Sequence, residues 1–230
     1  MFHLWSISVE EQFYLFAPWA VKKLDRRSLS GFGIALIVSA NVWLLFLGKA
    51  QAPDGAIWCN SFVQFENFAA GILLCLMLHG ITPRIRAWQR PALLAAWALC
   101  WLYASLGFHT HSGVDAVTSS LSLIGGYGLV ALGSCFLLIA FLGLDKKLLP
   151  SWAIYLGRIS YGLYVFHVPA LHFIDRVFNH FPASWSVAML FKGATAMGFT
   201  ILLASLSYRY FETPFLKIKR QHEVIVSRPV

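Results

Sequence analysis

The chain has 230 residues, of which 58% are hydrophobic and only 12% are charged, whereas a soluble domain carries about 25% charged residues. Its formal net charge is +8, but the Lys and Arg residues lie in short segments between long apolar runs rather than along a basic helical face. These features exclude a soluble globular domain and argue against nucleic-acid binding, and they predict an all-α, polytopic integral membrane protein.

Seven apolar segments approach the length of about 20 residues that a helix needs to cross a bilayer core. They cover, in chain order, about 9–20, 31–48, 62–80, 91–108, 122–144, 153–178 and 187–211. We expect helices because open strands leave backbone groups unpaired in hydrocarbon, and we expect an interruption of the sixth segment at Pro169. The predicted fold is a bundle of about seven transmembrane helices over residues 1–216, followed by a basic tail over residues 217–230.

The basic residues predict an orientation for this bundle. Fifteen of the 18 Lys and Arg residues lie near one set of predicted helix ends, which the positive-inside rule makes cytoplasmic. The chain start is then outside and the C-terminus is cytoplasmic. A first crossing that enters from outside directly after Met1 lacks a preceding signal, so we expect this chain to be the C-terminal part of a longer membrane protein.

The polar stretch around the first predicted helix contains two carboxylates. Ser8 and Glu11 have the spacing of a capping box, which predicts that Glu11 caps the helix at the membrane surface. Glu10 shares a different helix face with Tyr14, and we expect this face to point into the bundle because lipid does not tolerate a carboxylate. Glu10 is therefore a candidate site residue. The alternative is that both glutamates are interfacial caps.

Four stretches together resemble a known family. The string WSISVEEQFYLFAP at 5–18 strongly resembles the signature of the membrane acyltransferase 3 family, the O-acyltransferases that acetylate bacterial surface polysaccharides and related acceptors. NFAAGIL at 67–73, LGRISYGLYVFHVP at 156–169 and YRYFETPF at 208–215 are similar to later motifs of that family, in the expected order. Asn67 stands where the family often has an acidic residue, although Glu66 is adjacent.

The resemblance implies an enzyme of the cell (inner) membrane that transfers an acyl group other than an aminoacyl group. The expected donor substrate is acyl-CoA, with acetyl the expected group, and the expected acceptor is a hydroxyl of a glycan or lipid-linked saccharide. No bound cofactor, no metal and no nucleic acid are expected. The family's proposed catalytic histidine and its arginine motif belong to earlier helices, so we expect the chain to be incomplete or inactive alone.

The candidate site residues fall into three groups. The catalytic candidates are Glu10, Ser6 and Tyr14. The substrate-binding candidates are Trp5, Gln12, His167 and Tyr161. The structural candidates are Glu11, Glu212 and Arg209.

Several of these residues have a structural alternative. His167 lies two residues before Pro169, so it either lines a tunnel for the acyl donor or bonds to a carbonyl near the kink. Tyr161 is either a substrate contact or a packing residue at the membrane interface. We expect Pro214 to end the last helix and Glu212 to pair with Arg209 or Arg158, because a carboxylate opposes the dipole at a helix C-terminus.

Two alternatives for the whole chain stay open. A transporter would show inverted repeats or paired broken helices, and the sequence has one broken helix without a partner. An inactive fragment of a broken reading frame is the other possibility. His109, His111 and Asp115 form a polar cluster, but a His-x-His pair without a third strong ligand does not predict a metal site.

Overall fold

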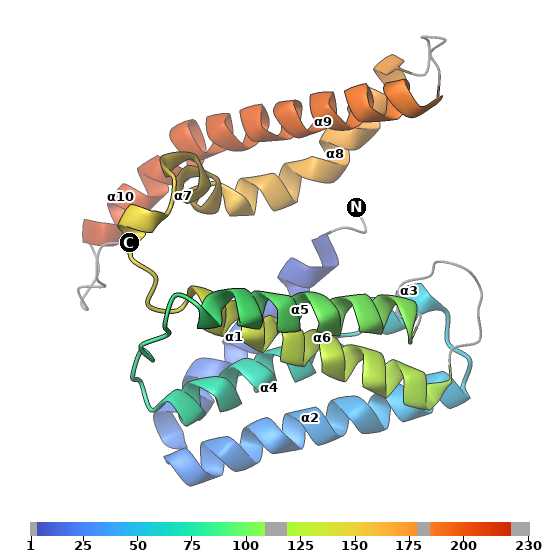
Figure 1. Ribbon diagram of the computed structural model, residues 1–230, viewed down its shortest axis with the longest axis vertical. Helices are drawn as coiled ribbons and strands as arrows, with labels where there is room; N and C mark the ends of the chain where they lie inside the picture. Colours follow the sequence, from blue (N-terminus) through green and yellow to red (C-terminus); the bar gives the residue numbers. More distant parts are fainter. Residues whose placement is uncertain (1–3, 109–118, 179–184, 222–230) are drawn as a thin grey trace. The chain divides into compact units, whose positions relative to one another are not determined.

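The computed structural model describes residues 4–108, 119–178 and 185–221, and these ranges are almost entirely helical, with no β-strand among them (Figure 1). Contacts divide the chain into two compact units, residues 1–144 and 145–230. The predicted all-α class is therefore confirmed.

Among the residues that the structure describes, the first unit contains six α-helices. They are α1 (Trp5–Lys23), α2 (Arg26–Lys49), α3 (Asp54–Trp58), α4 (Ser61–Leu78), α5 (Gln89–Leu106) and α6 (Ser120–Phe141). Helices α2, α4 and α6 pack against one another, α5 lies along α6, and α1 lies against α4. The short helix α3 lies in the segment that connects α2 to α4.

The three central helices each begin at a side-chain cap. Asp25 accepts a hydrogen bond from the N–H of Ser28 at the start of α2, at 3.3 Å. Asn60 accepts from the N–H of Phe62 at the start of α4, at 3.0 Å. The cap of α6 has the same form, with the Ser119 hydroxyl accepting from a main-chain N–H. Such caps satisfy N–H groups that the first turn of a helix leaves free, which fixes where each helix begins.

Small residues allow the central helices to approach closely. A Cβ atom placed on Gly48 of α2 would lie 2.9 Å from the Cα of Ser120 in α6. A Cβ on Gly33, also in α2, would lie 3.1 Å from the side chain of Leu73 in α4. Without a hydrophobic driving force between helices in lipid, such close backbone packing is a main source of association.

Two buried clusters hold the first unit together. The first joins α2, α4 and α6 with α3 and consists of Leu44, Ile57, Val63, Leu123 and Tyr127. The second joins α1 to α4 and is centred on Val9, Phe13 and Phe65. The rings of Phe13 and Phe68 stack there, with centroids 4.3 Å apart.

The second unit is an antiparallel pair of long helices with shorter flanking elements. They are η2 (Lys146–Leu148), α7 (Ser151–Arg158), α8 (Ser160–Phe178), α9 (Trp185–Ser207), the π-helix η3 (Tyr208–Glu212) and α10 (Thr213–Gln221). Helices α8 and α9 pack together along their lengths. At one crossing, a Cβ on Gly162 would lie 3.1 Å from the Cα of Ala204. Lys192 and Asp175 form an ion pair between the same two helices.

Four stretches in the described ranges are long and apolar enough to cross a membrane. They are Arg26–Lys49, Ser61–Leu78, Ser120–Phe141 and Met189–Ile218. The chain is therefore a helical membrane protein. The other three predicted segments are helical as well, as α1, as α5 and as α7 with α8, but the predicted count of seven crossings is not confirmed.

Two prolines do not interrupt the helices where the sequence predicted. The sixth segment breaks at the fully buried Ile159, between α7 and α8, and α8 continues through Pro169. The last helix does not end at Pro214 either, because α9 passes into η3 and then α10. Proline cannot donate to the carbonyl four residues before it, and the wider π-helical turn accommodates this loss. Within that turn the Thr213 hydroxyl donates to the Tyr208 carbonyl at 2.7 Å.

Candidate functional site

The motif at 5–18 forms helix α1, and its apolar residues build one face of that helix. Trp5, Val9, Phe13 and Phe16 belong to the cluster against α4. The Trp5 ring meets the ring of Trp58 edge to face, with centroids 5.6 Å apart. The aromatic part of the motif therefore fixes α1 on α4, and Trp5 is engaged in that packing.

The three catalytic candidates lie on a different stripe of α1. Ser6, Glu10 and Tyr14 recur at every fourth position, so they lie one above another along the helix. Ser6 is half-buried and has a contact of its own, whereas Glu10 and Tyr14 are exposed. This stripe is about a quarter turn away from the face that packs on α4. The spacing predicted from the sequence is thus realised as a continuous polar stripe.

Glu10 is not buried in the way that the sequence suggested. We expected its carboxylate to face neighbouring helices, but it is exposed, because Val9 and Phe13 occupy the side of α1 that meets α4. Its assignment to a site stays a prediction.

Glu11 does not cap the helix. Helix α1 begins at Trp5, so Ser8 and Glu11 lie inside it, and the helix start at Leu4 has no side-chain cap. The Ser8 hydroxyl instead accepts a hydrogen bond from the Gln12 amide at 3.4 Å. The capping box fails because packing of Trp5 on Trp58 extends the helix by a turn beyond the predicted start.

A carboxyl group outside the predicted site lies in the core of the first unit. Glu66 of α4 is only 6% exposed. Its Oε1 accepts a hydrogen bond from the Asn41 amide of α2 at 3.4 Å, and that amide also donates to the Ile37 carbonyl at 2.8 Å. Its Oε2 has no hydrogen-bond partner within the described part of the chain. The carboxyl also faces α6, where a Cβ on Gly128 would lie 3.9 Å from Oε1.

In the second unit, His167 and Tyr161 lie on α8. His167 is half-buried, and its Nδ1 lies 2.5 Å from the carbonyl oxygen of Tyr164. This contact matches the structural alternative, although the carbonyl that Pro169 leaves without its usual donor is that of Val165. The Tyr161 side chain is 59% exposed, so its surface is accessible.

Glu212 does not form the ion pair that we expected. Its Oε1 is buried and has no hydrogen-bond partner among the residues that the structure describes. Arg209 instead lies over the ring of Tyr210, with its guanidinium carbon 5.6 Å from the ring centroid. The π-helical turn of Tyr208–Glu212 changes the helical register and separates the two side chains that an α-helix would bring together.

No group of three or more metal-ligating side chains occurs in the described ranges. The cluster of His109, His111 and Asp115 lies outside those ranges.

Comparison with known families now decides the relationship that the four motifs indicated. The profile of the acyltransferase 3 family, described as an acyltransferase domain, matches residues 1–209. The chain belongs to this acyltransferase family. The match includes the polar stripe of α1 and most of the second unit.

Two relatives illustrate where this acyltransferase chain falls in the family. It is 22% identical to the O-acetyltransferase OatA of Staphylococcus aureus strain NCTC 8325, over 94% of this chain and 36% of that protein. A protein of S. aureus strain COL, provisionally named an O-acetyltransferase, has the same identity and coverage. The chain thus spans about a third of the length of these curated relatives. No solved structure matches it.

One signal in the acyltransferase sequence pointed to Glu66. It is the only Asp or Glu inside the apolar run 62–80, and an ionisable residue within a membrane span marks a functional or structural site by default. Its partner Asn41 lies 25 positions earlier, so sequence spacing alone does not join the two.

Proposed function

We propose that the chain acts in a membrane-bound O-acyltransferase. In this proposal an acyl group passes from acyl-CoA to a hydroxyl group of a glycan or lipid-linked saccharide. The acyl group is acetyl, as in the names of the relatives. The protein lies in the cell (inner) membrane with its C-terminus in the cytoplasm. The observation that carries the proposal is the family match over residues 1–209.

The reaction has simple chemical requirements. The acceptor hydroxyl oxygen attacks the thioester carbonyl carbon, a base takes the hydroxyl proton, and the carbon–sulfur bond breaks to release CoA. Hydrogen-bond donors stabilise the oxyanion that forms on the carbonyl oxygen. The stripe of α1 offers these chemical types, because Glu10 has a carboxylate and Ser6 and Tyr14 have hydroxyl groups.

We assign Glu10 to the acceptor side of this site. An exposed carboxylate is costly in contact with lipid tails, so at membrane depth the stripe must face protein or water. Trp5 and Gln12 lie on the same helix and are proposed to order the mouth of the site. His167 and Tyr161 of the second unit are proposed to contact the acyl donor.

The test of the function uses the protein at its native locus. Deleting the coding region in the organism of origin should remove acetate that mild alkali releases from the surface polysaccharide, and restoring the locus should return it. Unchanged acetate after deletion contradicts the proposal. A lower amount of exported polysaccharide, with the same acetate per sugar, would indicate a transporter instead.

A further inference from the structure

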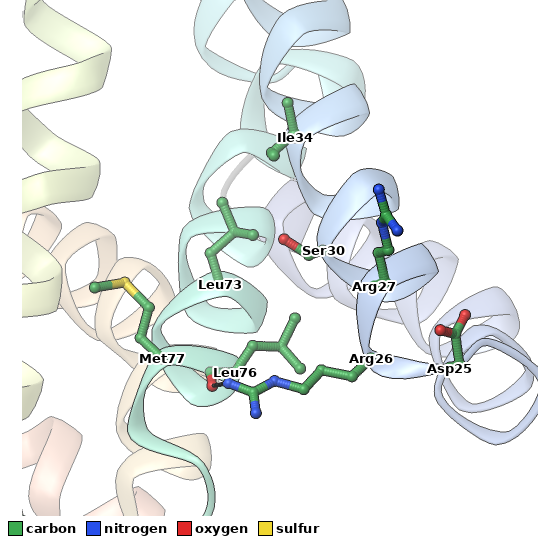
Figure 2. Close-up of a pocket in the computed structure, with 8 residues that line it drawn as sticks. All are labelled: Asp25, Arg26, Arg27, Ser30, Ile34, Leu73, Leu76 and Met77. Carbon is green, nitrogen blue, oxygen red and sulfur yellow. Dashed lines mark hydrogen bonds between the residues drawn. The ribbon is translucent and has the colours of Figure 1, made fainter.

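A groove opens between the start of α2 and the end of α4 (Figure 2). Its volume is about 650 Å³. Charged residues line one end and apolar side chains line the rest; they are Asp25, Arg26, Arg27, Ser30, Ile34, Leu73, Leu76 and Met77. Both helices are candidate membrane spans, so the groove lies where spans meet the polar boundary of the membrane.

Arg26 joins the start of α2 to the end of α4. Its guanidinium donates to the carbonyl oxygen of Leu76 at 2.9 Å, and another of its nitrogens lies 2.7 Å from Nδ1 of His79. The last carbonyl groups of α4 lack the N–H donors that a further helical turn would supply, and they carry partial negative charge. Arg26 therefore neutralises the C-terminus of α4, which would otherwise repel an anion.

Arg27 is left available for a ligand. Its side chain is exposed, and its guanidinium makes no hydrogen bond or ion pair with a residue in the described ranges. Figure 2 shows it on the opposite side of the groove from the Arg26 head group. It also stands in the first turn of α2, where the helix dipole favours a negative charge.

Asp25 does not cancel this preference for an anion. Its carboxylate caps α2, and hydrogen bonds from the Ser28 side chain and main chain lower the pKa of Asp25 below its ordinary value. It is thus ionised at neutral pH and committed to the cap. Together with Arg26 and Arg27, it leaves a formal charge of +1 at this end.

The remaining wall of the groove suits an acyl chain. Ile34 of α2 and Leu73 and Met77 of α4 lead away from the charged end, and Ile34 and Met77 are largely exposed. None of the lining residues in the described part of the chain is aromatic, so these residues offer no surface on which a nucleotide base could stack. A ligand with a phosphate group and an acyl chain fits these features better than a nucleotide does.

We propose that this groove binds an anionic phospholipid of the surrounding bilayer. The phosphate meets Arg27 and the first turn of α2, and an acyl chain lies along Ile34, Leu73 and Met77. A lipid can enter sideways because the groove is open along two candidate spans. Basic pockets between membrane helices bind anionic head groups in this way.

The experiment measures lipid retention by the purified chain. Phosphatidylglycerol and phosphatidylcholine are titrated separately into detergent-solubilised protein, and the bound lipid is counted by native mass spectrometry. The unaltered protein should retain one phosphatidylglycerol in preference to phosphatidylcholine. Arg27→Gln should weaken that binding about fivefold, the effect of one basic residue near an anionic head group.

Two further variants sharpen the result. Arg84→Gln removes an exposed arginine that does not line the groove, so it should retain phosphatidylglycerol like the unaltered protein. Met77→Glu adds a carboxylate at an exposed wall position and should reduce binding by charge repulsion. Thermal unfolding in detergent without added phospholipid should be the same for Arg27→Gln and the unaltered protein, which excludes misfolding as the cause.

Three outcomes overturn the proposal. The first is that Arg27→Gln retains phosphatidylglycerol as well as the unaltered protein. The second is that Arg84→Gln loses as much binding as Arg27→Gln, which would mean a general effect of charge. The third is that free CoA displaces phosphatidylglycerol at equal concentration, which would make the ligand a soluble nucleotide rather than a lipid.

Discussion

Arg26, in the first turn of α2, donates a hydrogen bond to the main-chain oxygen of Leu76, in the last turn of α4 and 50 positions later in the chain. The same guanidinium contacts His79, which has a φ of 54°. That region of backbone conformation is unusual for any residue other than glycine. The arginine therefore joins two candidate spans at the point where α4 ends.

Replacing Arg26 by Ala should destabilise the first unit by about 1 kcal/mol, because the Leu76 carbonyl loses the guanidinium donor at 2.9 Å and keeps only the longer hydrogen bond from the His79 N–H at 3.3 Å. Arg27→Ala should leave the free energy of unfolding unchanged, since the Arg27 guanidinium has no partner in the described ranges. Unfolding of both variants in detergent micelles, titrated with sodium dodecyl sulfate, provides the measurement. Equal stability of the two variants would show that the Arg26 contacts contribute nothing.

Gly48→Ala should destabilise the protein by about 1–3 kcal/mol, because the new methyl group would meet the backbone of Ser120 on α6. The matched control is Gly31→Ala in the same helix, where a Cβ has no neighbour within 4 Å. That control should stabilise the protein by about 0.5 kcal/mol, because alanine has the higher helix propensity. The same unfolding titration compares the two variants. An unchanged free energy of unfolding for Gly48→Ala would mean that α2 and α6 lie farther apart than described.

The pair of Asn41 and Glu66 predicts a non-additive double variant. Asn41→Leu removes the donor to Glu66 Oε1 and should cost about 1–3 kcal/mol, because it leaves a buried carboxyl without that partner. Adding Glu66→Leu should recover much of this loss, since replacing both polar partners by apolar ones is nearly neutral. A double-mutant cycle of unfolding free energies measures the coupling. Simple additivity would mean that the two side chains do not interact.

Asp25 predicts a pH dependence with a defined sign. Hydrogen bonds from Ser28 lower the pKa of Asp25, so its cap stabilises the folded state fully above the unfolded pKa of about 3.9. That stabilisation is lost as the pH falls through the lower pKa of the folded state. The difference in melting temperature between the unaltered protein and Asp25→Ala should therefore narrow in acid.

Asn60 provides the control for this pH effect. Its side chain caps α4 in the same manner but does not titrate. The melting-temperature difference caused by Asn60→Ala should not change over the same pH range. A parallel narrowing for both variants would trace the acid effect to other groups.

The sequence was informative wherever a local property decides the structure. Long apolar runs predicted the positions of the helices, because a membrane span needs a minimum apolar length. The motifs at 5–18 and 156–169 indicated the family that the match over residues 1–209 then showed.

The sequence misled where contacts between distant residues decide the structure. The start of α1 depends on the packing of Trp5 on Trp58, which outweighs the local capping pattern at Ser8. The break between α7 and α8 occurs at the buried Ile159, whereas Pro169, where the sequence predicted the interruption, lies inside α8. Local rules for proline and for caps describe preferences that tertiary packing can override.

The central claim is that α1 carries the acceptor side of an acyltransferase site at Glu10. Its most direct test is the transfer of radiolabelled acetate from acetyl-CoA into alkali-labile esters by membranes of the organism of origin. The membranes come from three strains, whose native locus encodes the unaltered protein, Glu10→Gln or the exposed control Glu11→Gln. All three membranes contain equal amounts of this protein. The account predicts that Glu10→Gln abolishes transfer while Glu11→Gln retains it. Full transfer by Glu10→Gln, or none by unaltered membranes, would contradict it.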